Sequence, residues 1–265
     1  LFDQSPLKPA YRDPQPLGVA ADPGEARFVG FDGGIVEIGH DGDGFAFDCE
    51  GPRHRALLEP YRLADRLVTN GEYLAFVEDG GYRDPLLWLS AGWGTILGEG
   101  WTRPFYWHER DGEMWTMTLR GAQPLDLNAP VTHLSYFEAD AFATWAGKRL
   151  PTEFEWENAA ASLPVEGNFA GSGRLRPKPA APGEGLRQMY GDVWEWTRSP
   201  FSPYPRFKPV EGAVGEYNGK FMCGQFVLRG GSCATPENHV RTTYRNFFPP
   251  DARWQFSGLR LAEDA

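Results

Sequence analysis

The chain has 265 residues, 41% of them apolar and 14% aromatic, with a formal net charge of -10 at pH 7. This composition supports a buried core and excludes a disordered chain, and the lack of a basic stripe argues against nucleic acid or an anionic membrane as partner. Glycine (32) and proline (23) together exceed their ordinary share of about 12%. We therefore expect a loop-rich α+β domain.

Residues 1–24 contain five prolines and little apolar periodicity. They are predicted to form an extended connector, either from a preceding domain or as an arm that wraps this one. Residues 25–265 then form a single domain. The sequence shows no signal peptide and no run of about eighteen apolar residues, so we expect a cytoplasmic protein.

Strand-like patterns begin with Phe28 to Phe31 and Ile35 to Ile38, which flank Gly33 and Gly34. We expect these two segments to form an opening hairpin. Further along the chain, residues 171–185 are predicted to form a surface loop. Short strands are expected at Val193 to Trp196, Phe226 to Leu228 and Leu259 to Ala262.

Three helix starts are marked by a Ser or Thr followed three residues later by Glu, the pairing that satisfies free N–H groups at a helix N-terminus. The pairs are Thr69/Glu72, Ser135/Glu138 and Thr152/Glu155. After Ser135, an apolar stripe of Phe137, Ala141 and Trp145 predicts a short amphipathic helix ending near Gly147.

Few residues suggest a local catalytic or metal centre. The three cysteines have no CxxC spacing and are expected to be reduced and buried, although Cys223 and Cys233 would pair if they lay on adjacent strands. The histidines lack the spacing of two ligands on one helix face and are expected to be surface or hydrogen-bonded residues. They are His40, His54, His108, His133 and His239.

The segment from Tyr244 to Pro250, YRNFFPP, places aromatic rings and a carboxamide beside two prolines. Prolines prevent long regular structure, so we expect a rigid aromatic loop. Such a loop either covers the core or forms the wall of a pocket for a cationic ligand held by ring faces.

Three segments resemble formylglycine-generating-enzyme-like domains, the sulfatase-modifying factor family. They are Pro130 to Glu157 with WAGKRLPTEFEWE, Gly191 to Thr197 with Asp192 in place of the commoner Asn, and Leu228 to Ser232 together with Gly258 to Ala262. The resemblance runs from about Phe28 to the C-terminus. It implies a C-type-lectin-like α+β fold with a small twisted antiparallel sheet and short helices.

Within this family, formylglycine-generating enzymes carry two reactive cysteines after the Arg-Gly-Gly-Ser turn, where this chain has Cys233 alone. Other segments are more similar to iron-dependent sulfoxide synthases of ergothioneine biosynthesis: residues 10–12, 31–40, 63–73, 215–222 and 244–250. Those enzymes use dioxygen to join a cysteine-type thiol to the imidazole of trimethylhistidine.

In those synthases Fe(II) is bound by three histidines of an N-terminal helical domain, two of them in a His-x-x-x-His-x-Glu motif that this sequence lacks. The resemblance therefore implies a substrate-binding lobe, inactive alone, whose partner is that iron-binding domain. It implies that Asn246, Phe247 and Phe248 line the substrate pocket and that Tyr217 faces the trimethylammonium group. No catalytic acid is assigned.

Related domains hold structural calcium, for which Asp192 and Glu195 are the candidate ligands. Two alternative functions remain open at this stage. One is a copper-dependent formylglycine-generating oxidase, which requires two thiolates in one pocket. The other is a non-catalytic lectin-like binding module, which predicts no affinity for a betaine.

Overall fold

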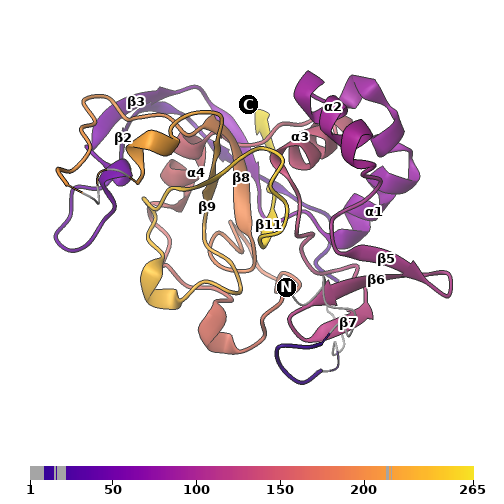
Figure 1. Ribbon diagram of the computed structural model, residues 1–265. Coiled ribbons are helices and arrows are strands. Elements are labelled where there is room, and N and C mark those ends of the chain that lie inside the picture. The colour runs from indigo at the N-terminus through magenta and orange to yellow at the C-terminus, as the bar shows by residue number, and fades with distance from the viewer. Residues whose placement is uncertain (1–8, 15, 17–21, 213–214, 216) are drawn as a thin grey trace.

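The computed structural model describes residues 9–14, 16, 22–212, 215 and 217–265. These residues form an α+β domain of short strands and four short α-helices joined by long irregular segments (Figure 1). The helices are α1 (Asn70–Glu78), α2 (Ser90–Glu99), α3 (Tyr136–Trp145) and α4 (Glu153–Ala160). No helix of the described part of the chain is long and apolar enough to cross a membrane.

A four-stranded sheet lies at the centre of the molecule, with the strand order β10-β9-β8-β11 (Figure 1). Strand β11 pairs in parallel with β8, and the other pairs are antiparallel. Strand β10 is therefore an edge strand. The bounds are β8 (Trp194–Pro200), β9 (Phe226–Arg229), β10 (Asn246–Phe248) and β11 (Ser257–Gly258).

Three smaller sheets surround the central one. One has the order β1-β4-β12, one is the pair β2-β3, and one has the order β5-β6-β7. Helices α1, α2 and α3 gather on one side of the molecule, and the β2-β3 pair extends on the other (Figure 1). The bounds are β1 (Phe28–Phe31), β2 (Gly34–Ile38), β3 (His54–Leu58), β4 (Tyr61–Ala64), β5 (Trp107–Arg110), β6 (Glu113–Thr118), β7 (Gly121–Pro124) and β12 (Ala262–Asp264).

The prediction of an opening hairpin is wrong. Strand β1 pairs with β4, placing Phe28 opposite Ala64, whereas β2 pairs with β3. Gly33 explains the separation: its φ is 72°, and a Cβ there would lie 2.4 Å from the carbonyl oxygen of Leu58. The chain at Gly33 therefore lies close against the end of β3. The strand before it, β1, pairs with β4, and the strand after it, β2, pairs with β3.

The predicted helix starts are confirmed. Thr69, Ser135 and Thr152 each accept a hydrogen bond from the backbone N–H three residues on, and each Glu side chain bonds back. Helix α3 covers the predicted apolar stripe, and Gly147 follows it with φ 65°. Its buried face packs with α1 and the central sheet in the largest apolar core, which includes Tyr73, Phe76, Phe142, Trp196 and Leu228.

Two of the strand predictions hold closely and one does not. Strands β8 and β9 lie where they were expected, but Leu259 and Arg260 lie between β11 and β12. Both residues are fully buried. Arg260 pairs with Glu195 of β8 and donates to the carbonyl of Ala64, so its side chain is held by an ion pair within the core.

The described part of the N-terminal segment lies along the turn between β6 and β7. The amides of Tyr11 and Arg12 both donate to the carbonyl oxygen of Leu119, at 2.9 and 3.1 Å. Arg120 in turn donates to the carbonyl oxygen of Asp13. This stretch is therefore hydrogen-bonded to the domain.

Candidate functional site

The candidate site is built on the edge strand β10. Its register places Asn246 opposite Leu228, Phe247 opposite Val227 and Phe248 opposite Phe226. Because side chains alternate along a strand, Asn246 and Phe248 point to one face of the sheet and Phe247 points to the other. The side chains of the three consecutive residues predicted to line one pocket therefore lie on both faces of the edge strand β10.

On the Phe247 side, four aromatic rings meet. Phe247 stacks on Phe201 with the ring centroids 4.1 Å apart, and it lies 5.8 Å from Phe221 and 6.3 Å from Tyr217. Tyr217 and Phe221 are themselves 5.2 Å apart. Phe201 is buried, but Tyr217 is 62% and Phe221 41% exposed. We call Tyr217, Phe221 and Phe247 the ring cluster.

On the other side, Phe248 packs edge-on against Trp254, with the ring centroids 5.2 Å apart. Trp254 is 59% exposed. The side-chain oxygen of Asn246 accepts a hydrogen bond from the amide of Phe247 at 3.0 Å. Its Nδ2 group donates no hydrogen bond to the described residues, so it remains available to an acceptor outside the chain.

An ion-pair network anchors β10 from its N-terminal end. Arg245 makes two hydrogen bonds to the carboxylate of Glu153 and donates to the carbonyl oxygens of Cys49 and Ser202. Arg229 pairs with the same carboxylate at 2.9 Å. Burial would raise the pKa of Glu153, but the two guanidinium groups outweigh it and hold that pKa below its ordinary value.

Some residues around β10 were not assigned a role from the sequence. Phe221 lies four residues after Tyr217, and the intervening 3-10 helix η6 (Gly219–Phe221) brings the two rings together. The four-residue spacing of these two aromatic residues is a local pattern from which Phe221 could have been identified in the sequence. No local sequence pattern places Trp254 or the 3-10 helix η1 (Asp48–Glu50) near β10, because both reach it only through tertiary packing.

The three cysteines are all free thiols. Cys49 and Cys233 are buried as expected, but Cys223 is exposed. Burial raises the pKa of Cys49 to about 12 and that of Cys233 well above its ordinary value. Cys223 and Cys233 are not bonded to each other, and they differ in exposure, since Cys223 is exposed and Cys233 is buried.

The two candidate calcium ligands have protein partners. Asp192 accepts hydrogen bonds from Asn168, Gln188 and the amide of Lys178, and Glu195 pairs with Arg260 at 2.9 Å. Both carboxylates are buried. Among the described residues, no group of three or more His, Cys, Asp or Glu is arranged to hold a metal ion.

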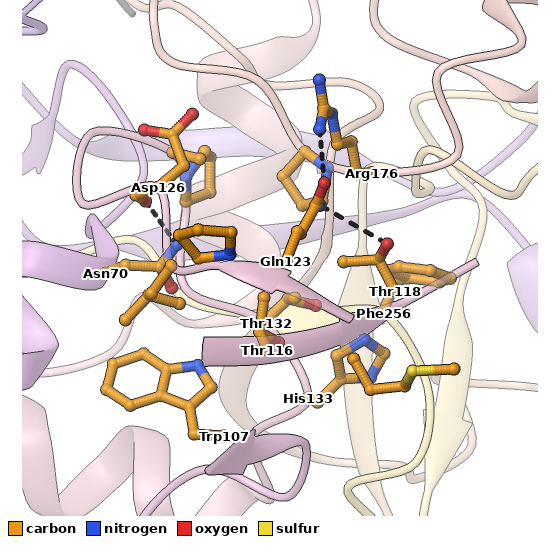
Figure 2. A pocket seen from close by; sticks show the side chains of 16 residues that line it. Asn70, Trp107, Thr116, Thr118, Gln123, Asp126, Thr132, His133, Arg176 and Phe256 are labelled. Atoms are coloured by element: carbon orange, nitrogen blue, oxygen red, sulfur yellow. Dashed lines mark hydrogen bonds between the residues drawn. The ribbon is translucent and has the colours of Figure 1, made fainter. Parts of the chain in front are cut away.

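A separate pocket lies between the β5-β6-β7 sheet and the segment before α3 (Figure 2). Trp107, His133 and Phe256 form its inner wall, whereas the charged ends of Asp126 and Arg176 point away from these rings. Burial lowers the pKa of His133 to about 4, so this imidazole is neutral at pH 7.

Comparison with known proteins gives the family of this domain. Residues 19–182 and 172–265 match the sulfatase-modifying factor enzyme 1-like domain. The chain belongs to this family, which confirms the resemblance in the sequence. The structure of PvdO from Pseudomonas aeruginosa shares the fold, with a TM-score of 0.61 at 19% identity over 93% of this chain and 100% of that chain.

Two curated relatives with different names are similar to this chain. The hercynine oxygenase of Mycolicibacterium thermoresistibile is 39% identical over 254 residues, covering 83% of this chain and 54% of the relative. The formylglycine-generating enzyme of Streptomyces coelicolor is 31% identical over 301 residues, covering 94% of this chain and 93% of that enzyme. The chain therefore spans about half the length of the hercynine oxygenase.

Proposed function

We propose that this chain is the substrate-binding lobe of a non-haem iron, O2-dependent sulfoxide synthase of ergothioneine biosynthesis. The reaction joins a cysteine-type thiol to the imidazole of trimethylhistidine, also called hercynine. The 39% sequence identity to the hercynine oxygenase of M. thermoresistibile supports this assignment. The structural observation that carries it is the ring cluster on the edge strand β10.

The ring cluster suits a quaternary ammonium group. A trimethylammonium has no N–H to donate, so it is recognised by the negative faces of aromatic rings, each contributing about 0.5 to 2 kcal/mol. Tyr217 and Phe221 are exposed, and both rings lie near Phe247. Together they offer apolar, electron-rich surface to such a cation.

Asn246 complements the ring cluster as a carboxylate anchor. Its side-chain oxygen is already bonded to the amide of Phe247, so the NH2 group is fixed as the outward donor. Phe248 and Trp254 lie on this side of the strand. We propose that hercynine straddles the edge of β10, with its ammonium on the ring cluster and its carboxylate at Asn246.

The described residues lack a ligand set for iron. The proposal therefore assigns Fe(II) to a partner, the N-terminal helical domain, which is outside this chain. When bound there, the iron would activate dioxygen for formation of the carbon–sulfur bond. The role of this chain would be to bind and orient hercynine, and its isolated form would be inactive.

Calorimetric titration tests the substrate assignment. The sample is this chain joined to the part of the M. thermoresistibile hercynine oxygenase that it does not match, titrated with hercynine and with unmethylated histidine. We expect Phe247→Ala to weaken hercynine binding about 2- to 30-fold and to leave weak histidine binding unchanged. Phe248→Ala is also expected to weaken hercynine binding, because it removes the wall beside Asn246.

Phe28→Ala is the matched control, because Phe28 is a half-buried strand phenylalanine in the separate β1-β4-β12 sheet. It should leave hercynine binding unchanged. Equal affinity for hercynine and histidine, or no binding of either, would contradict the proposal. Those outcomes would favour a binding module for a different ligand.

A further inference from the structure

The residue after Tyr217 has the opposite exposure. Asn218 is 5% exposed, whereas Tyr217 is 62% exposed. The Nδ2 group of Asn218 donates to the Oδ1 atom of Asp48 at 2.6 Å, across a sequence separation of 170 residues. The carbonyl oxygen of Asn218 accepts from the amide of Phe221 at 3.1 Å. Asn218 thus bonds both to Asp48 and to the backbone of Phe221, and it directly follows Tyr217 in the chain.

The partner of Asn218 belongs to the 3-10 helix η1, which also holds the segment leading into β10. The carbonyl oxygen of Cys49 accepts from Arg245 at 2.9 Å. The carboxylate of Glu50 accepts from Arg241 at 3.1 Å and from Thr243 at 2.6 Å. Consecutive residues of η1 therefore bind the two chain segments that supply the ring cluster.

Strand β10 is held by its pairing with β9 and by the Arg245–Glu153 ion pair, whereas the 3-10 helix η6 is a single short turn. Tyr217 and Phe247 are 6.3 Å apart between ring centroids, so a small displacement of either segment would open the cluster. The bond from Asp48 to Asn218 links the turn to the 3-10 helix η1, whose Cys49 carbonyl oxygen accepts from Arg245.

We infer that Asp48 is a positioning residue, which acts through Asn218 to hold Tyr217 and Phe221 beside Phe247 so that the three rings form one ammonium-binding surface. This inference rests on the proposed function, since it concerns the affinity of that surface for hercynine. Asp48 does not itself belong to the ring cluster. Its effect on binding passes through the hydrogen bond to Asn218.

The contact is suited to a double-mutant cycle with a conservative rescue. Asp48→Ala and Asn218→Ala each remove the hydrogen bond between these two residues. The double variant should therefore bind hercynine no more weakly than either single variant. We expect each to weaken hercynine binding about tenfold, the effect of losing one hydrogen bond to a charged group. Asp48→Asn keeps an oxygen acceptor and should stay within about twofold of the unsubstituted protein.

A second readout is independent of the ligand. Hydrogen exchange at the amide of Phe221, which bonds to Asn218, should accelerate in both alanine variants and not in Asp48→Asn. Unchanged exchange in the alanine variants would overturn the anchoring role. Faster exchange with unchanged hercynine affinity, or full additivity in the double variant, would overturn the positioning role.

These results remain distinct from a failure of the proposed function. If the unsubstituted protein, joined to the unmatched part of the hercynine oxygenase, binds no hercynine, then the substrate assignment fails. The positioning inference fails with it. If that protein binds hercynine and Asp48→Ala binds it equally well, only the positioning inference fails.

Discussion

Glu153 is the carboxylate on which the anchoring of β10 depends most. It lies in the first turn of α4 and accepts hydrogen bonds from Arg229, Arg245 and Tyr204. Both arginine side chains are fully buried. The substitution Glu153→Gln keeps the volume of the side chain but removes its charge, leaving Arg245 with only carbonyl oxygens as hydrogen-bond acceptors.

The expected loss of stability is large. Breaking a buried ion pair from one side costs about 3 to 5 kcal/mol, because the remaining charge stays buried without its counter-ion. Glu157 still pairs with Arg229 at 2.9 Å, so we expect the lower end of that range. In a domain of this size, about 3 kcal/mol lowers Tm by roughly 6 to 12 °C.

The assay is urea unfolding followed by tryptophan fluorescence, with calorimetry for Tm. Glu37→Gln is the matched control, because its ion pair with Arg53 is 3.6 Å long and both side chains are at least 40% exposed. That variant should change the free energy of unfolding by less than about 1 kcal/mol. A Glu153→Gln variant as stable as the Glu37→Gln control would refute the reasoning.

Three further predictions follow from burial and hydrogen bonding. The pKa of Glu153 is lower in the folded chain than in the unfolded chain, so the stabilisation by its carboxylate is complete above the unfolded pKa and is lost as pH falls through the folded pKa. Between pH 7 and pH 3, the free energy of urea unfolding should therefore fall less in Glu153→Gln than in the unsubstituted chain. A maleimide reagent should label exposed Cys223 in the folded chain and reach buried Cys49 and Cys233 only after unfolding, and early labelling of all three by mass spectrometry would contradict the burial. Thr69→Ala removes the cap of α1 and should cost about 0.5 to 2 kcal/mol in urea unfolding, whereas an unchanged midpoint would show that the cap is unimportant.

Local signals in the sequence predicted the helices well. The capping pairs at Thr69, Ser135 and Thr152 depend on contacts within one turn, and all three are present. Strand pairing was harder to predict, because it depends on partners far apart in the chain. Strand β1 finds its partner about 33 residues later in β4, so the proximity of β2 in the sequence was misleading.

The substrate-binding role of Tyr217, Asn246, Phe247 and Phe248 stays a prediction. In the structure, Tyr217 and Phe247 lie 6.3 Å apart between ring centroids, and Phe247 stacks on Phe201. The alternation along β10, which separates Phe247 from Asn246 and Phe248, required knowledge that this segment pairs with β9. The contact of Asp48 with Asn218 spans 170 residues, and no local pattern encodes it.

The most direct test of the central claim is catalysis with the iron-binding part restored. This chain would be joined to the part of the M. thermoresistibile hercynine oxygenase that it does not match, loaded with Fe(II), and supplied with hercynine, dioxygen and cysteine as the thiol. We predict hercynine-dependent oxygen consumption and a sulfoxide product detectable by mass spectrometry, both reduced by Phe247→Ala. A folded, iron-loaded protein that consumes no oxygen in response to hercynine would contradict the account.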